Sequence, residues 1–256
     1  MAKLSGQFCA VLFHGYDISG RTRSFDGMGV EYTELDHTAF LDGVMGSEAG
    51  MPLLDASVES FFDPQPDATP GPETSVWKAL REPGNNTIEK LLSVLIGQGA
   101  SPVPGDPSLA VASRQFKVTV PAQPNAKMLI QANFKTVGQK PDLGQVLGYT
   151  TITNTLTGTT VDTAVGPYAA GGTGYLHVLK ATTEDTPGTD TYSIKIQHSP
   201  NGTAWADYIT FAANGATRTS ERIKQTTSLD RYWRCLLTRT GAAADELTFA
   251  IMLAAN

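Results

Sequence analysis

The second half of the chain alternates apolar and polar residues with a period of two. In "TYSIKIQH", Ile194 and Ile196 fall on one face while Lys195 and Gln197 fall on the other, as in a strand with one face in a core. The turn residues "SPNG" and a second apolar run follow, so residues 193–211 predict a strand–loop–strand unit. Further short runs ("GYLHVLKA", "SERIKQ", "RYWRCLLT", "LTFAIMLA") are separated by turns and show no helical period, which predicts a β-sandwich.

The first half mixes strand patterns with long loops. The continuous apolar run Phe8–Phe13 predicts a buried strand. Residues 53–62 alternate loosely, with Ala56 and Val58 on the apolar face. Two more runs alternate and predict strands with one core face each. The residues expected on these core faces are Phe116, Val118 and Val120 in the first run and Met128, Ile130, Ala132 and Phe134 in the second.

One segment, "NNTIEKLLSVLIGQG", has the spacing of an amphipathic helix over residues 87–96. Asn86 and Glu89 fit a capping box, and Gly97 fits the left-handed position after the last turn. The apolar face of this predicted helix should pack on the sheet of the first half. Its residues are Ile88, Leu91, Leu92 and Leu95.

The string "VGQKPDLGQVLG" separates the mixed first half from a Thr-rich second half. Glycine and proline mark turns and linkers, so we expect two domains, residues 1–145 and residues 146–256. The predicted class is mainly β: an N-terminal β-sandwich or barrel flanked by one α-helix, followed by a C-terminal β-sandwich of immunoglobulin-like or jelly-roll-like type.

Composition narrows the possible functions. Charged residues make up 17% of the 256 residues, below the usual ~25%, which suits either a surface hidden against partners or simply Thr/Gly/Ala-rich β-structure. The net charge of −6 argues against a general binder of phosphate backbones. The two cysteines, Cys9 and Cys235, are expected to be buried free thiols. The apolar run near the start is too short for a secretion signal or a membrane span, so we expect a soluble protein made in a cytosol.

The histidines, cysteines, serines and carboxylates show no recognisable catalytic or metal-binding spacing in the sequence. The four histidines are scattered (His14, His37, His177 and His198), and no G-x-S-x-G elbow or phosphate-cradling loop is present. We therefore expect no enzyme activity, no metal and no cofactor. Four carboxylates lie in or beside predicted strands, on polar faces: Glu31, Glu34, Asp55 and Glu59.

Four strings follow one another in a familiar order: "GGTGYLHVLKA", "YSIKIQHSPNGTAWADYITF", "TRTSERIKQTTSLDRYWRCLLT" and "LTFAIMLA". They resemble the C-terminal β-sandwich region of tail proteins of long, flexible-tailed bacteriophages. The shared pattern is I-Q-x-S-x-[DN]-G-x-x-W-x-D, a Phe-ended strand, an R-Y-x-R strand and a terminal strand. The first half is similar, in the order of its elements, to the major tail tube protein of these phages, and "GDPSLAVASRQFKVTVPAQPNAKMLIQANF" resembles its paired-strand segment.

The resemblance implies a structural virion protein, made in the host cytoplasm, that forms hexameric rings stacked into a tail tube. The genome would pass through this tube without specific binding, and the partners would be further copies of the chain and the tape measure, tail terminator and tail tip proteins. No insertion into a membrane is implied. Glu31, Glu34, Asp55 and Glu59 could face the lumen, because like charge keeps DNA sliding; an ordinary solvated exterior is the other interpretation of these acids.

A β-sandwich module that binds carbohydrate or a receptor is the alternative function. It would use Trp205, Trp233, Tyr175 and Tyr208 as stacking surfaces, and it predicts exposed, coplanar aromatic rings. The tube interpretation instead makes Trp205 and Trp233 packing residues.

Overall fold

The computed structural model of the chain describes residues 9–26, 31–36, 47–61, 79–80, 89–98, 100–120, 129–137, 140–184 and 189–256. This part is mainly β-structure, with two short 3-10 turns (η2, Ser19–Arg21, and η3, Thr182–Glu184) and helical residues only at Ala79–Leu80. The strands are β1 (Cys9–Phe13), β2 (Tyr16–Asp17), β3 (Thr22–Asp26), β4 (Glu31–Asp36), β5 (Ser47–Phe61), β6 (Lys90–Ile96), β7 (Pro107–Thr119), β8 (Leu129–Val137), β9 (Asp142–Ile152), β10 (Leu156–Thr157), β11 (Val161–Asp162), β12 (Gly172–Lys180), β13 (Thr191–Ser199), β14 (Ala206–Thr210), β15 (Thr219–Gln225), β16 (Tyr232–Thr240) and β17 (Leu247–Ala255).

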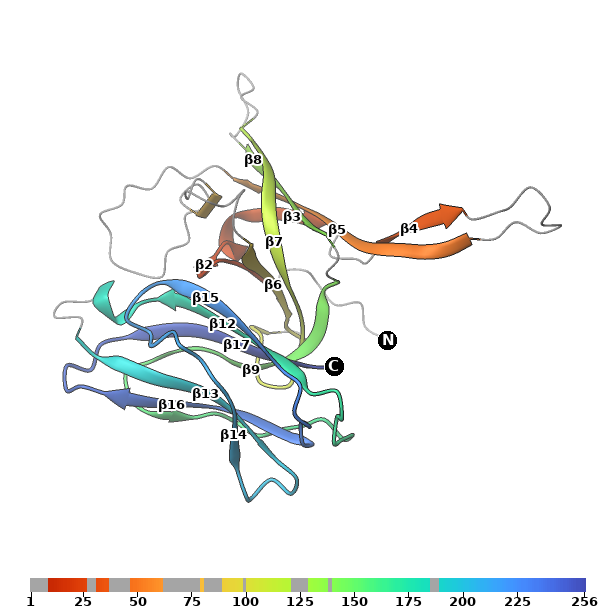
Figure 1. Cartoon of the computed structure of the whole chain (residues 1–256). Helices are drawn as coiled ribbons and strands as arrows, with labels where there is room; N and C mark the ends of the chain where they lie inside the picture. Colours follow the sequence, from red (N-terminus) through yellow and green to blue (C-terminus); the bar gives the residue numbers. More distant parts are fainter. Residues whose placement is uncertain are drawn as a thin grey trace.

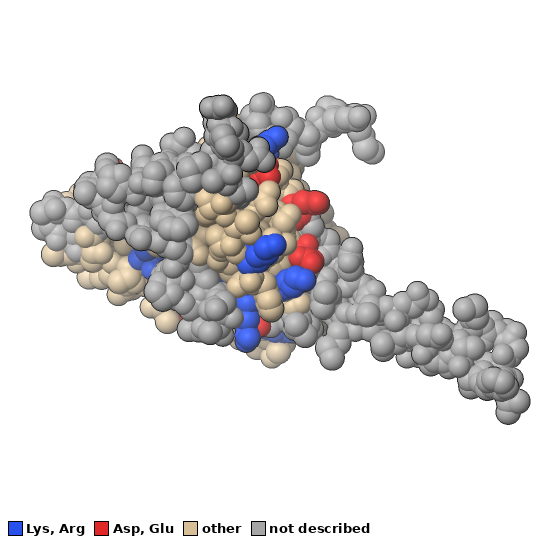
Figure 2. Space-filling view, turned by 90° about the horizontal axis from the view of Figure 1, so that it is seen from above, with Lys and Arg blue, Asp and Glu red and all other residues tan. Residues whose placement is uncertain are grey.

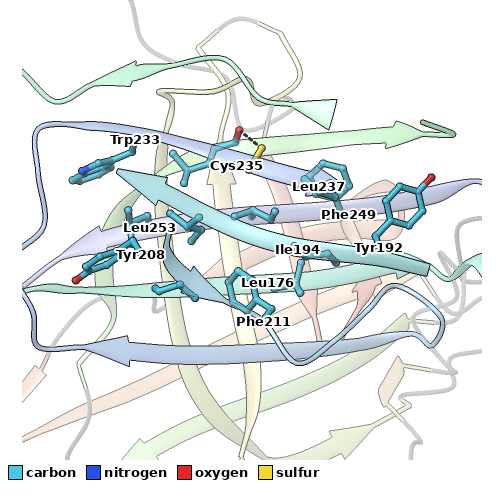
Figure 3. Packing of buried hydrophobic residues seen from close by; sticks show 14 of the residues in the cluster. Leu176, Tyr192, Ile194, Tyr208, Phe211, Trp233, Cys235, Leu237, Phe249 and Leu253 are labelled. Atoms are coloured by element: carbon cyan, nitrogen blue, oxygen red, sulfur yellow. Dashed lines mark hydrogen bonds between the residues drawn. The ribbon is translucent and has the colours of Figure 1, made fainter. Parts of the chain in front are cut away.

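The second half forms the β-sandwich that its sequence predicts. Strands β10, β16, β13 and β14 make one layer with β11 beside β16, and β15, β12, β17 and β9 make the other. Leu176 and Phe249 from one layer meet Ile194 and Leu237 from the other in a closed apolar core (Figure 3). These residues alternate with residues on the opposite face of each strand, so the period of two places one face of each strand in this core.

The first half is built from two further layers that share β7. The N-terminal part of β7 pairs with β6, and its C-terminal part pairs with β8, which continues to β5 and β3. Between the layers, the Phe13 and Phe134 rings lie 4.8 Å apart, tilted by 53°. Leu92 and Val94 on one layer and Val58 on the other complete this second core. The chain thus curls around its own hydrophobic residues.

The predicted helix over residues 87–96 is wrong, because β6 spans Lys90–Ile96 as a strand between two cores. Leu92 and Val94 face the core of the first half, while Leu91 and Leu95 face the opposite side. A strand buried on both faces is a continuous apolar run, and such a run can also satisfy a helical spacing. Ile88 lies outside the described residues.

The core face predicted for residues 116–120 is wrong for Phe116 and Val118, while Val120 packs against the first-half core. The register between β7 and β8 shifts between Gln115 and Lys117, and the extra residue, Phe116, is 61% exposed. A bulge adds one residue to a strand and thereby re-aims the side chains around it. Val118 is exposed as well, near the end of the strand.

The two halves meet in a third core, in which alanines pack among larger apolar side chains. Strand β9 pairs with β7 over Asp142–Gln145 and with β17 over Gln145–Ile152, so one sheet runs through both halves and folds back on itself. Alanines and leucines from β1, β6 and β7 pack there against β12 and β17. The predicted boundary at 145/146 therefore falls within β9, where its partner strand changes; the separation into two domains stays a prediction.

Candidate assembly surfaces and the junction between the halves

Metal ligands are not gathered in the part of the chain that the structure describes. Within those residues, no three His, Cys, Asp or Glu side chains gather closely enough to hold a metal ion. His198 has a structural contact, because its Nδ1 accepts the backbone N–H of Asp230 at 3.1 Å. The helical residues in the described ranges include no helix of the length and apolarity that a membrane crossing requires. The candidate functional features are surfaces and the junction between the halves.

The first such surface is a two-stranded arm formed by β4 and the beginning of β5. Glu31 of β4 lies opposite Leu53, and Asp36 lies opposite Ser47. Within the described residues, Ser47–Pro52 of β5 pair with β4 alone, and the arm reaches away from the layered body (Figure 1). A two-stranded hairpin by itself is marginally stable in water, so an arm of this kind gains most from contact with another surface.

The outward face of β5 and β8 carries two of the four predicted acids, and both are paired with bases. Asp55 Oδ2 lies 3.0 Å from Lys135 Nζ, and Glu59 Oε1 lies 3.2 Å from Arg23 Nη1. Glu59 Oε2 also accepts a 2.8 Å hydrogen bond from Gln131 Nε2. Figure 2, which views the molecule from above, shows acidic and basic side chains next to one another. This face carries both signs of charge.

The other two predicted acids, Glu31 and Glu34, lie in β4 of the arm, opposite Leu53 and Ala49. The four acids are thus divided between the arm and the outward face of β5. Because β5 runs through both, one strand connects the two groups.

A polar row crosses the outer face of the second-half sandwich. The Arg234 guanidinium lies 4.1 Å above the ring centre of the half-buried Trp205, and its Nε and Nη2 donate to Gln197 Oε1 at 2.9 and 2.8 Å. Gln197 and Lys195 donate in turn to Asp207 at 2.8 and 2.6 Å. The hydrogen bond from Lys195, followed by that from Gln197, lowers the pKa of Asp207. This row fastens β14 to β13 and β16.

Sequence alternation predicts that Tyr232 and Arg234 share a face, but it does not predict the row. The "W-x-D" part of the motif indicates that its Trp and Asp share a face, because residues two apart on a strand point to the same side. Trp205 and Asp207 stand at that spacing, and both belong to the motif that carries the resemblance to tail proteins. Most polar side chains of the motif therefore serve this outer face or the turn at Asn201.

The aromatic residues expected of a sugar-binding module are mostly buried. Trp233 is 3% exposed, and Tyr175 and Tyr208 are buried too. Trp233 donates its Nε1–H to the backbone oxygen of Asp230 and contacts the ring of Tyr168. Trp205 alone of the four is half-buried, and it lies against Arg234.

A set of polar contacts closes the junction between the two halves. Tyr149 Oη donates to Asp17 Oδ2 at 2.6 Å, and burial, with the Asp17 charge, raises the pKa of the Tyr149 hydroxyl. Arg218 lies 5.1 Å above the Tyr16 ring and donates to the backbone oxygen of Gly15. His177 adds two more bonds to the first half. Directional contacts thus join the two halves.

No protein-family description matches this chain, and no curated protein matches its sequence. Three solved structures are similar to this chain in part. The tube-terminating cap of the anti-feeding prophage is 11% identical with a TM-score of 0.42, covering 57% of this chain and 93% of that chain. The Dit protein of phage SPP1 is 11% identical with a TM-score of 0.31, covering 96% and 98%. A chain of the phage p2 baseplate is 10% identical with a TM-score of 0.34, covering 95% and 97%. Overlaps of this size carry no conclusion about function.

Proposed function

We propose that the chain is a structural subunit of a bacteriophage tail that assembles with copies of itself. In this proposal six copies form a ring, and stacked rings make the tail tube through which the genome is ejected into the host. The motif order in residues 171–253 carries the proposal. Its four strings supply β12, then β13 and β14, then β15 and β16, and then β17, in the order expected of the tail-protein sandwich.

The arm formed by β4 and β5 supports self-association. It extends a sheet edge into solvent, and exposed edges attract further strands unless another chain covers them. Its strands are joined to the body through β5, which is continuous from the arm to the outward face of the first half. A copy of the same chain is the partner that a ring requires at this position.

In the assembled virion the chain would also contact the tape measure, tail terminator and tail tip proteins. DNA would pass the wall without specific binding, and the chain would assemble in the host cytoplasm without entering a membrane. We keep the acids Glu31, Glu34, Asp55 and Glu59 as candidates for the lumen. The ion pairs of Asp55 and Glu59 leave their face with both signs of charge, which gives a polyanion little net attraction.

A shortened arm tests the proposal. A variant in which a short Gly-Ser turn replaces residues 32–51 should remain folded, because in the described structure β4 pairs only with β5. Sedimentation across a range of concentrations should show large assemblies for the unchanged chain and monomers for the variant. If both chains remain monomeric at the highest concentration, self-association is not the function. If the variant assembles as well as the unchanged chain, the arm is not the contact.

A further inference from the structure

One histidine of the second half is fully enclosed by the first. His177 of β12 is 0% exposed. Its Nδ1 lies 3.3 Å from the backbone N–H of Gly15, in the turn between β1 and β2, and its Nε2 lies 2.9 Å from Ser93 Oγ of β6. Both partners belong to the first half. The ring thus bonds the two halves to each other.

These contacts determine which ring nitrogen of His177 carries the hydrogen. Because the Gly15 amide can only donate, Nδ1 must accept and carries no hydrogen. The remaining hydrogen lies on Nε2, which therefore donates to Ser93 Oγ. A second proton on Nδ1 would point at the N–H of Gly15 and would add a charge where water does not reach. The closed junction accordingly requires the neutral ring.

The surroundings also oppose a positive charge on His177. His14 lies in the same turn as Gly15 and has its Nδ1 3.1 Å from Ser220 Oγ of β15. Arg218, just before β15, donates a hydrogen bond from Nη1 to the backbone oxygen of Gly15 at 3.2 Å. His14 also lines a cavity of about 530 Å³, whose other charged lining residues are Arg222, Lys90 and Glu89. Among the described residues, no carboxylate hydrogen-bonds to the His177 ring. Burial, followed by the nearness of His14, lowers the pKa of His177 to about 3.

We propose that the junction between the halves is an acid-sensitive latch, in which protonation of His177 releases β12 from Gly15 and Ser93. The open junction exposes the ring to water, where its pKa returns to about 6.5. The pKa is thus lower in the closed state than in the open one. The stability of the closed junction is therefore fully present above about pH 6.5 and is lost as the pH falls toward the closed-state value. This device does not depend on ring assembly.

The size of the effect follows from proton linkage. Two pH units below the open-state pKa, the ratio of open to closed junctions should rise by about 100-fold, provided that the closed ring remains neutral there. Hydrogen–deuterium exchange measures this ratio at the Gly15 amide, after correction for the intrinsic pH dependence of exchange. Protection at Gly15 should fall by about 100-fold between about pH 7.5 and about pH 4.5.

Three variants isolate the ring responsible. His177→Asn keeps an oxygen that can accept the Gly15 N–H but cannot be protonated in this range, so the acid response should be lost. His198→Asn, in the second half away from Gly15 and Ser93, should keep the full response. His14→Asn suits the left-handed backbone at this position (φ 46°) and should also keep a response. If the acid response is lost in His14→Asn and kept in His177→Asn, the titrating ring is His14, and the proposal is wrong.

Nitrogen NMR of the unchanged protein tests the same point without a variant. The His177 ring should remain neutral, with hydrogen on Nε2, at every pH at which the junction is closed. Titration of His177 near pH 6.5 with Gly15 still protected would overturn the proposal, and so would protection that does not change with pH. Either result can be obtained even if His177→Asn does not fold.

Discussion

Strands of the outer and inner layers of this molecule differ in the pattern of apolar and polar residues along their sequence. Strand β13, in an outer layer, buries Ile194 and Ile196 on one face and turns Ser193 and Lys195 toward solvent. Strand β6, in an inner layer, buries residues on both faces. Strand β13 therefore alternates, whereas β6 is mainly apolar on both faces. In these two strands, the period of the pattern reports the layer as well as the secondary structure.

Deletion of residues 151–256 should have the largest effect, because it removes one complete side of the inner core. Tyr175, Leu179 and Met252 pack there against the first half, and β9 would lose β17 as its partner. We expect the fragment to lose its cooperative unfolding transition, as measured by circular dichroism in urea. A fragment that unfolds cooperatively and still assembles would establish the two separable domains that the sequence predicts.

Truncation of one buried leucine in each type of layer compares their packing. Leu92 of β6 and Leu237 of β16 are both fully buried. Substitution of either by Ala should lower the free energy of unfolding by about 2–5 kcal/mol, measured by urea denaturation. Leu143→Ala is the control, because Leu143 is 76% exposed and should change stability by less than about 0.5 kcal/mol. A Leu92→Ala value as small as that of the control would mean that β6 is not an inner strand.

The two thiols should react at different rates. Cys235 is fully buried and donates to the backbone oxygen of Leu147 at 3.3 Å; its burial raises its pKa to about 11. Cys9 is half-buried, and burial raises its pKa as well. Because the thiolate is the reactive form, a disulfide reagent at about pH 8 should label Cys9 first and Cys235 on the order of 100-fold more slowly. Equal rates in the folded protein would contradict the closed sandwich core.

Charge reversal on the outward face should have the smallest effect on stability. Asp55→Lys combined with Glu59→Lys removes two ion pairs that are partly open to solvent, each contributing about 0–1 kcal/mol. If these residues line the channel, genome ejection should become slower, most clearly at low salt. The control exchanges one pair, Asp55→Lys with Lys135→Asp, and leaves the net charge unchanged. Normal assembly with an unchanged rate of ejection would place this face outside the lumen.

The parts of the fold that the sequence predicts are those with a single buried face. The alternation around Ile194 and Ile196 and around Ala56 and Val58 agrees with their burial. The pattern at β6 wrongly predicts a helix because "KLLSVLI" buries side chains on both faces and follows residues that resemble a helix cap. Its short length favours a strand, since helices usually run for ten residues or more.

The surfaces were harder to predict, because they depend on pairs distant in sequence. Asp55 meets Lys135 only because β5 pairs with β8, and alternation does not give strand partners. The contact of His177 with Gly15 and Ser93 requires three elements to be placed at once. A histidine inside an apolar strand was the one available signal, and by itself it indicates only a satisfied buried side chain.

Electron microscopy of the purified protein tests self-assembly into a tube most directly. The unchanged chain, concentrated and negatively stained, should form six-membered rings and stacks of such rings, with the arm at the contacts between copies. The same rings should be visible along the tail of virions that carry the protein. Single particles without rings at high concentration, together with tails in which the protein forms no rings, would contradict the proposed tube.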